Sequence, residues 1–201
     1  MDPLRLVQVG PDQLHLYASI PISFWVERVL RVQPVDGGLG GLCLVEEPVP
    51  EPYLKDYDNI EMEDPDQERP TRWPTTFDVS NWAFFLAFHN DTPVGGAAVA
   101  FDSPGVNMLE GRRDLAVLWD IRVHPGHRGQ GVGSALFRRA AEWARSRNCR
   151  QLKIETQNIN VPACRFYAAM GCHLGVINRY AYLSVPSIAH EVMLLWYLDL
   201  T

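Results

Sequence analysis

The sequence lacks the features of several large classes of protein. None of its apolar runs approaches the roughly 20 residues of a membrane-spanning helix. The N-terminal stretch MDPLRLVQVGPDQ has no basic start followed by an apolar segment, so we expect no signal peptide. Basic residues are outnumbered, with 18 Lys and Arg against 24 Asp and Glu and a formal net charge of -6. This balance disfavours general nucleic-acid binding and suits a neutral or cationic ligand.

Cysteine is also scarce, and its spacing is uninformative. The four cysteines form no CxxC pair and no metal-ligand spacing: Cys43, Cys149, Cys164 and Cys172. We therefore expect reduced thiols in a cytoplasmic protein. His124 and His127 lie three residues apart with no third ligand nearby, so we expect no metal. Cys164 has no His or Asp spaced to activate it as a nucleophile.

The overall composition is that of a globular protein. With 201 residues, 47% apolar and 21% charged, the chain suits one domain with a full core, spanning 1–201. Its part before residue 80 contains a segment, 48–76, that is rich in proline and acids: Glu51, Asp56, Asp58, Glu61, Glu63, Asp64, Asp66 and Glu68. We expect a mobile or loosely packed loop there, either simply solvated or attracting a polycationic substrate by its charge.

Hydrophobic patterns predict a mixed α/β sheet. Strands are expected near 22–32, 42–46, 82–89, 94–101, 115–123, 151–155, 173–183 and 190–200. A long amphipathic helix is expected over 132–147, and a second helix follows Asn160, which suits a cap, and ends at Gly171. Strict alternation along 115–123 predicts one face with Leu115, Val117, Trp119, Ile121 and Val123, and another with Leu118, Asp120 and Arg122.

The most informative local pattern is the turn Arg128-Gly129-Gln130-Gly131-Val132-Gly133, between a strand and the long helix. Its alternate glycines and the helix N-terminus favour an anion site, most often a phosphate or pyrophosphate site. A P-loop would need a Lys after the last Gly, and a dinucleotide fold would need Gly at Leu136, although Glu155 imitates its ribose-binding acid. A tight turn without a ligand is the other alternative.

The segment Val123–Gly133 resembles the acetyl-CoA signature of the GNAT acetyltransferase superfamily, which is Arg or Gln, two residues, Gly, one residue, then Gly or Ala. The second helix resembles the family's N-x-x-A-x-x-x-Y-x-x-x-G segment through Asn160, Ala163, Tyr167 and Gly171. The resemblance implies a GNAT-type central mixed, mostly antiparallel sheet flanked by helices. It also implies acetyl-CoA as the cosubstrate.

A narrower resemblance is to streptothricin acetyltransferases. It rests on five segments: Trp119–Val123, Glu155–Asn160, Ala163–Tyr167, Trp196-Tyr197, and Pro52-Tyr53-Leu54-Lys55 before the acidic loop. The implied reaction moves an acetyl group from acetyl-CoA to a primary amine of a small cationic substrate, with streptothricin the best match. The alternatives are another small amine or a protein amine, a non-catalytic acyl-CoA-binding module, or a nucleotide-binding α/β domain.

The resemblance also implies where acetyl-CoA binds. The pyrophosphate suits the backbone N–H groups from Gln130 to Ser134, with Arg128 either adding positive charge or pointing to solvent. The end of the 115–123 strand would bond the pantetheine arm, and an N–H near Ile121 or Val123 would steady an oxyanion. The expected cofactor-binding residues are Ile121, Arg122, Val123, Arg128, Gly129, Gln130, Gly131, Val132, Gly133, Ser134 and Asn160.

Three residues are candidates for catalysis. Tyr167 is the candidate general acid for the departing thiolate, and its alternative role is a core residue on an apolar helix face. Asp120 and Glu155 are candidate general bases for the substrate ammonium. The alternative roles for these two acids are a salt bridge to Arg122 or a helix cap, and a water relay is the alternative to either acid as the base. The expected partner is a small amine, with no nucleic acid and no membrane, and the closing strand suits either a homodimer or the monomer sheet.

Overall fold

The computed structural model describes residues 3–59 and 69–200, which form two compact units. Unit 1 contains the chain up to residue 22, residues 57–154 and the C-terminal end from residue 198. Unit 2 contains residues 23–56 and 155–197. The acids Glu61, Glu63, Asp64, Asp66 and Glu68 lie outside the described residues. The single-domain organisation expected from chain length stays a prediction.

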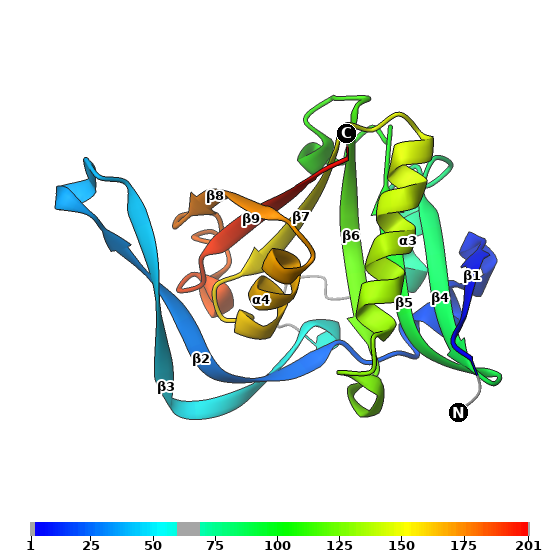
Figure 1. The fold of residues 1–201 in the computed structure, drawn as a ribbon, viewed down its shortest axis with the longest axis horizontal. Coiled ribbons are helices and arrows are strands. Elements are labelled where there is room, and N and C mark those ends of the chain that lie inside the picture. The colour runs from blue at the N-terminus through cyan, green and yellow to red at the C-terminus, as the bar shows by residue number, and fades with distance from the viewer. Residues whose placement is uncertain (1–2, 60–68, 201) are drawn as a thin grey trace. The chain divides into compact units, whose positions relative to one another are not determined.

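Unit 1 is built on a twisted sheet of mostly antiparallel strands (Figure 1). Its neighbouring strands are, in order, β1 (Arg5–Val9), β4 (Ala83–His89), β5 (Thr92–Ala100), β6 (Leu115–Val123) and the beginning of β7 (Gln151–Gln157). The pairs β1–β4, β4–β5 and β5–β6 are antiparallel, whereas β6 and β7 are parallel. The expected class, a mixed and mostly antiparallel α/β fold, is therefore confirmed.

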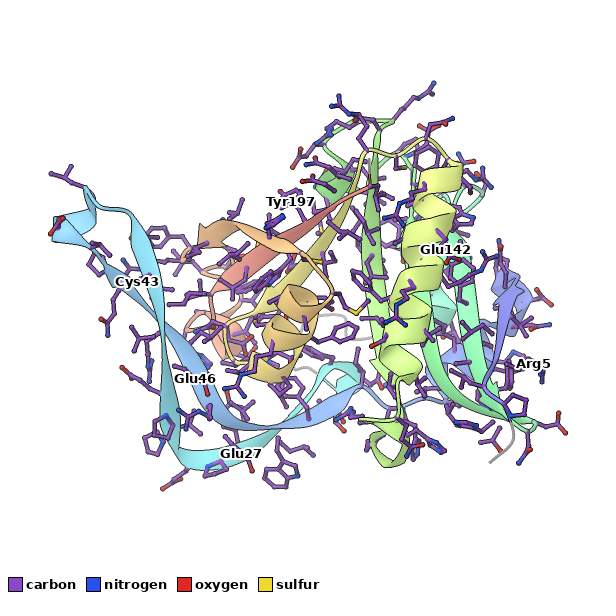
Figure 2. All side chains as sticks on the ribbon, viewed as in Figure 1. Arg5, Glu27, Cys43, Glu46, Glu142 and Tyr197 are labelled. Carbon is purple, nitrogen blue, oxygen red and sulfur yellow. The ribbon has the colours of Figure 1, made fainter. Side chains whose placement is uncertain are left out.

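Two helices cover opposite faces of this sheet, and two adjacent glycines of β5 show how closely. A Cβ at Gly95 would lie 2.8 Å from Val132 of α3 (Val132–Ser146). A Cβ at Gly96 would lie 2.5 Å from the ring of Tyr17 in α1 (Leu14–Ala18). Both helices thus approach the strand at positions where any side chain would separate them. The outer, charged face of α3 carries Glu142 (Figure 2).

The core on the α1 face of unit 1 is strongly aromatic. Trp73 of α2 (Trp73–Thr76) is buried and contacts the rings of Tyr17, Trp82 and Phe84 at centroid distances of 5.5, 6.2 and 6.1 Å. Pro70, just before this helix, is buried as well. The prediction of a loosely packed segment is therefore wrong for residues 70–76, because Trp73 and Pro70 bury apolar area that composition alone did not reveal.

Unit 2 contains a long two-stranded ribbon, β2 (Ser23–Pro34) paired antiparallel with β3 (Leu42–Asp56). The prediction of a loop is wrong for residues 48–56 too, because β3 extends to Asp56, and Pro48 and residues 53–56 pair with β2 on either side of a bulge. As an outer strand of a two-stranded ribbon, β3 accommodates its prolines where a central strand would not. Glu27, Cys43 and Glu46 mark this ribbon in Figure 2.

The rest of unit 2 holds α4 (Val161–Ala169) and strands β8 (His173–Asn178) and β9 (Met193–Asp199), which pair antiparallel. The expected strand 173–183 is shorter than predicted because the chain turns after Asn178, and β7 runs two residues further than predicted. Short 3-10 helices complete the chain at Pro11–Gln13, Asp36–Gly38, Tyr57–Asn59, Pro70–Arg72, Asn107–Leu109, Pro125–His127 and Pro186–Ile188.

A β-bulge in β6 overturns the predicted division of this strand into two faces. Ala98 pairs with Asp120 but Val99 pairs with Leu118, so Trp119 is an extra residue on β6. One extra residue reverses the alternation beyond it. Val117 and Asp120 therefore both face α1, where Asp120 accepts a hydrogen bond from Tyr17, although strict alternation had placed them on opposite faces.

Candidate active site

The glycine turn has a backbone that requires glycine at two positions. It begins with the 3-10 turn Pro125–His127, where the N–H of Gly126 donates to His124 Nδ1 at 3.2 Å. Gly129 and Gly131 then adopt φ angles of 75° and 84°. These lie in the left-handed region, which costs other residues about 1–2 kcal/mol. A Cβ at either position would meet nothing within 4 Å, so the backbone conformation, and not crowding, explains the glycines.

Helix α3 begins directly from this turn. Gly131 is its N-cap residue, and the N–H of Ala135 donates to the Gly131 carbonyl at 3.0 Å. The N–H groups of the preceding first-turn residues are those that a helix leaves without an intrahelical partner, and they carry the positive end of the helix dipole. The Gln130–Ser134 segment therefore has the backbone geometry that suits an anion, and the binding of an anion there stays a prediction.

Arg128 holds this turn against the end of β6. Its Nε donates to the carbonyl of Val123 at 3.1 Å. Of the two orientations left open by the sequence, the structure therefore shows a side chain anchored to the protein near the turn. Its charge adds to that of the helix N-terminus, so the end of β6 and the start of α3 lie in a positive local field.

The end of β6 has one open backbone edge. The described β6–β7 ladder ends at Leu118 and Ile154, although β6 continues to Val123. The N–H of His124 donates to Val94 of β5 at 2.9 Å. Because successive residues of a strand direct their backbone groups to opposite edges, those of Ile121 and Val123 face away from β5. The carbonyl of Val123 accepts from Arg128, which leaves the N–H groups of both residues and the carbonyl of Ile121 for an extended ligand at this edge.

Arg122 behaves differently from its neighbours. Its backbone faces β5, where it pairs with Gly96, and its side chain is buried on the α1 face. Nη1 donates to the carbonyl of Ile20 at 3.1 Å and to Asp58 at 3.0 Å. Arg122 was predicted to bind the cofactor, but the structure places its side chain in an internal ion-pair network.

Asp120 is the centre of that network. Arg122 Nε and Nη2 donate to its two carboxylate oxygens at 3.0 and 2.7 Å, and the Tyr17 hydroxyl donates at 2.7 Å. Burial lowers the pKa of Arg122, but the charge and hydrogen bonds of Asp120 outweigh it and raise that pKa above its usual value. Burial and the Asp120 charge raise the pKa of Tyr17 well above its usual value. Three donors thus hold the Asp120 carboxylate. Among the roles that the sequence left open for Asp120, the structure shows the salt bridge to Arg122.

Tyr167 lies on α4 in unit 2, with 5% of its surface exposed. Its ring lies 5.4 Å from Phe166 and 6.5 Å from Trp196, measured between centroids. The helix begins as predicted: the Asn160 side chain accepts from the N–H of Ala163 at 3.1 Å, and Pro162 lies in the first turn. This cap fixes the start of the helix and hence the direction of Tyr167.

Glu155, the other candidate base, lies in unit 2 beside a residue that the sequence did not suggest. The Tyr182 hydroxyl donates to Glu155 Oε1 at 2.7 Å, and Gln157 Nε2 donates to the same hydroxyl at 3.0 Å. Tyr182 lies in the turns after β8, where a strand had been expected. Its signal in the sequence was an aromatic residue in a polar stretch, which is too common to single it out.

Comparison with known proteins decides the family. The model of the Acetyltransferase (GNAT) family matches residues 51–172, which include β4–β7, the glycine turn and α4. The chain belongs to this family. Within it, streptothricin acetyltransferase A of Bacillus subtilis (strain 168) is 30% identical over 152 residues, 76% of each chain. The streptothricin acetyltransferase of Escherichia coli is 42% identical over 84 residues, 42% of this chain and 48% of that protein.

Solved structures agree with this placement in the GNAT family. The crystal structure of nourseothricin acetyltransferase matches all of both chains with a TM-score of 0.75 and 26% identity. A putative streptothricin acetyltransferase from Bacillus anthracis str. Ames, in complex with acetyl coenzyme A, matches with a TM-score of 0.73 over 98% of this chain and 99% of that one. At 24% identity, this second likeness supports the fold alone.

Three further features of this GNAT chain concern metal ligands, thiols and membrane spans. Within residues 3–59 and 69–200, no three His, Cys, Asp or Glu side chains are grouped to hold a metal. Burial raises the pKa of Cys164 to about 12, so its thiolate is scarce at neutral pH. None of the helices in the described part of the chain is long and apolar enough to cross a membrane. The cytoplasmic location stays a prediction.

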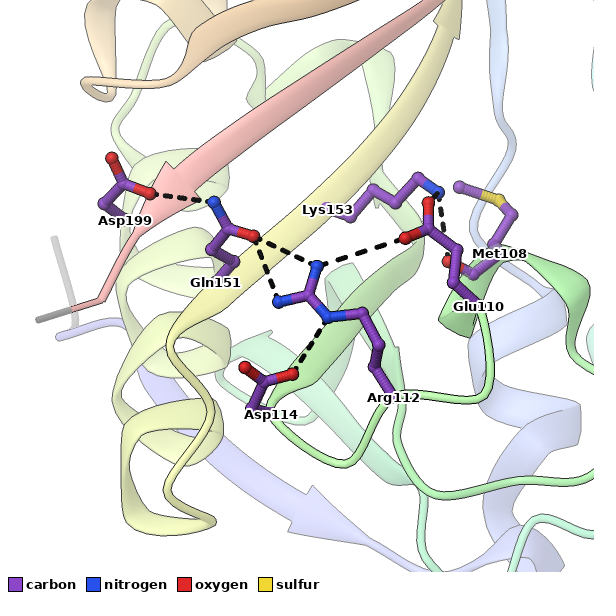
Figure 3. A network of polar contacts seen from close by, with 7 residues as sticks. All are labelled: Met108, Glu110, Arg112, Asp114, Gln151, Lys153 and Asp199. Atoms are coloured by element: carbon purple, nitrogen blue, oxygen red, sulfur yellow. Dashed lines mark hydrogen bonds and ion pairs between the residues drawn. The ribbon is translucent and has the colours of Figure 1, made fainter.

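The connection 102–114 of this GNAT chain is held by a polar network in unit 1 (Figure 3). Buried Lys153 donates to Glu110 at 2.7 Å and to the Met108 carbonyl at 3.1 Å. Arg112 bridges Asp114 and Gln151, and Gln151 in turn donates to Asp199. The loop surrounds a hollow of about 470 Å³, lined by residues 102–107, 109 and 110–113. These ties connect the loop to the start of β7.

Proposed function

We propose that this GNAT protein transfers an acetyl group from acetyl-CoA to a primary amine of streptothricin. The observation that carries the proposal is the combination in unit 1 of a positive-φ glycine turn, a helix N-terminus and an open edge of β6. The B. subtilis and E. coli relatives named as streptothricin acetyltransferases support the choice of acceptor. The net charge of -6 suits a cationic acceptor.

The residues of unit 1 fit acetyl-CoA. The N–H groups from Gln130 to Ser134, with Arg128 nearby, would hold the pyrophosphate, and Gly129 and Gly131 keep that backbone free of side chains. The open-edge backbone groups of Ile121 and Val123 would bond the pantetheine arm. The bound thioester supplies the acetyl group. Asn160 was also expected to bind acetyl-CoA. Its side-chain oxygen is used in capping α4, so we keep only its amide nitrogen as a contact for acetyl-CoA.

We assign the two proton transfers to unit 2. Glu155, directly or through a water, takes the proton from the acceptor ammonium, so that the neutral amine attacks the acetyl carbon. Tyr167 donates its phenolic proton to the departing thiolate. An N–H of Ile121 or Val123 would donate to the acetyl oxygen as negative charge develops there. Glu155 is preferred to Asp120, because Asp120 is held by Arg122 and Tyr17 and acts as a positioning residue.

The direct test is acetyl-CoA turnover, followed by release of free thiol. Streptothricin is assayed beside a polyamine, an aminoglycoside and a lysine peptide, and the acetylated product is identified by mass spectrometry. We expect turnover with streptothricin at a kcat/KM at least about a hundredfold above that of the other amines, the margin that several specific polar contacts provide. Faster turnover of the lysine peptide would reject streptothricin in favour of a protein amine. Acetyl-CoA binding without turnover of any amine would favour a non-catalytic module.

A further inference from the structure

One motif singled out in the sequence has no role in the proposed chemistry. Tyr53 and Lys55 of the segment Pro52-Tyr53-Leu54-Lys55 lie on β3, where they pair with Val26 and Phe24 of β2. Residues two apart on a strand share a face, so their side chains leave the ribbon on the same side. Both side chains face Glu191, in the segment that leads into β9. Lys55 donates to Glu191, and the negative charge of Glu191 acts on Tyr53.

Lys55 meets an unusually buried acid. Its Nζ donates to Glu191 Oε1 at 2.6 Å, and the Glu191 side chain is only 2% exposed. The second oxygen, Oε2, is buried and has no hydrogen-bond partner among the described residues. Leaving such an oxygen unsatisfied destabilises the fold, and the cost is greatest for charged groups. A carboxylate kept in this state is suited to accept a hydrogen bond from a ligand.

A pocket of unit 2 is lined by His190, the residue directly before this acid. It has a volume of about 320 Å³ and an apolar floor of Val29, Val49, Pro50 and Ile159. Tyr53, His190, Asn158, Glu51 and Arg31 complete its lining. The volume is at the lower end for small-molecule sites and suits one ring or one arm of a larger ligand.

Tyr53 connects the pocket to the acid. Its ring lines the pocket, and its pKa is raised by burial and then by the negative charge of Glu191. The phenol is therefore within electrostatic reach of the carboxylate. His190, also in the lining, directly precedes Glu191 in the chain. Arg31, the one basic residue of the described lining other than histidine, is paired with Glu47 at 3.5 Å.

We propose that Tyr53 and Glu191, braced by Lys55, form an acceptor subsite that binds a cationic N–H group, an ammonium or a guanidinium, of the acceptor. The inference rests on the proposed function. It adds the place at which one cationic group of a polycationic acceptor binds. The carboxylate accepts the N–H, the phenol oxygen accepts a second one, and the apolar floor contacts the carbon skeleton. An anionic ligand is disfavoured, because Glu51 lines the pocket and the arginine of the lining, Arg31, is paired with Glu47.

Equilibrium binding tests the subsite separately from turnover. Streptothricin, and spermine as a second polycation, are titrated by calorimetry into the full-length protein and the variants Glu191→Gln and Tyr53→Phe. We expect Glu191→Gln to weaken binding of the polycation about tenfold or more, and Tyr53→Phe about threefold or more. The KM for acetyl-CoA should stay unchanged. The matched controls are Glu27→Gln and Tyr180→Phe, exposed residues of the same unit that are outside the pocket lining.

The outcomes separate the two proposals. Variants that bind like the wild type would overturn the subsite, even if streptothricin is turned over rapidly. A wild type that binds neither polycation would overturn it as well. Failure to acetylate streptothricin, together with spermine binding that Glu191→Gln weakens, would reject the acceptor and keep the subsite. If Glu191→Gln unfolds because Lys55 loses its partner, Tyr53→Phe decides, since Tyr53 is 38% exposed and keeps its ring.

Discussion

Asp120 and Arg122, two residues apart on β6, form a bidentate ion pair, with Arg122 Nε and Nη2 at 3.0 and 2.7 Å from the two carboxylate oxygens. The bulge at Trp119 places both side chains on the α1 face, beneath the strand whose opposite edge we assign to the cofactor. Through Ile20 and Asp58, the same guanidinium also joins β6 to two other segments of unit 1. The pair therefore fixes the strand to these segments of unit 1.

Removing the carboxylate should lower stability strongly. Asp120→Ala leaves Arg122, 3% exposed, as a buried charge without its main partner, and we expect the free energy of unfolding to fall by about 3–5 kcal/mol. Urea unfolding measures it. Glu142→Ala, at an exposed site 3.9 Å from Arg139, is the control and should change it by less than about 0.5 kcal/mol. If Asp120→Asn folds with normal stability but loses all turnover, Asp120 is the base after all.

The Tyr17 hydroxyl should make stability sensitive to alkaline pH. Its pKa is raised in the folded state, so the stabilisation is fully present below the unfolded value of about 10 and is lost as pH rises above it. Tyr17→Phe removes a hydrogen bond to a carboxylate and should cost about 1.5–3 kcal/mol at pH 8. The difference between the two proteins should shrink by pH 11.

Urea unfolding under reducing conditions, at several values between pH 8 and pH 11, checks this prediction. The buried thiols also titrate in this range, with pKa values raised to about 11 for Cys149 and about 12 for Cys164 and Cys172. They contribute equally to both proteins and cancel in the difference. Parallel pH profiles for wild type and Tyr17→Phe would show that the phenol is not protected by folding.

Substitution in the glycine turn should affect acetyl-CoA selectively. Gly131→Ala forces alanine to a φ of 84° and should cost about 1–2 kcal/mol of stability. The same strain misdirects the backbone N–H groups, so the KM for acetyl-CoA should rise about tenfold, or about 1.4 kcal/mol. Gly105→Ala is the matched control: its φ is 86°, and a Cβ there also meets nothing within 4 Å. An equal rise in KM for both variants would argue against a phosphate site in the turn.

Loss of the phenol at position 167 should slow the reaction without unfolding the protein. Tyr167→Phe keeps the ring that contacts Phe166 and Trp196, so stability should change little. Without a proton donor for the thiolate, kcat should fall about a hundredfold or more while the KM for acetyl-CoA stays constant. Thiol release against pH measures the change. Tyr180→Phe, at a residue 68% exposed in the same unit, should behave as wild type. An undiminished kcat in Tyr167→Phe would make Tyr167 a core residue only.

Local patterns predicted those parts of the structure that depend on nearby residues. The long helix 132–147 matches α3 because its apolar stripe has helical spacing, and Asn160 caps α4 because the side chain needs to reach only three residues ahead. The same patterns missed β1 and α1, and they gave a loop for residues 48–56, the second part of β3, and for α2. Short elements such as these are stabilised by distant partners, as Trp73 is by Tyr17 and Phe84.

The sequence by itself determined the family and the local form of the glycine turn and of the α4 cap, because glycine spacing and helix caps act through adjacent backbone, whereas the acetyl-CoA residues stay a prediction. The tertiary structure decided what Asp120 and Arg122 do, because one extra residue in β6 reverses the face of every side chain beyond it. It also brought Lys55 and Tyr53 to Glu191, some 136 positions away from Lys55 in the chain. Pairings over such separations follow from sheet register and burial, which no local pattern encodes.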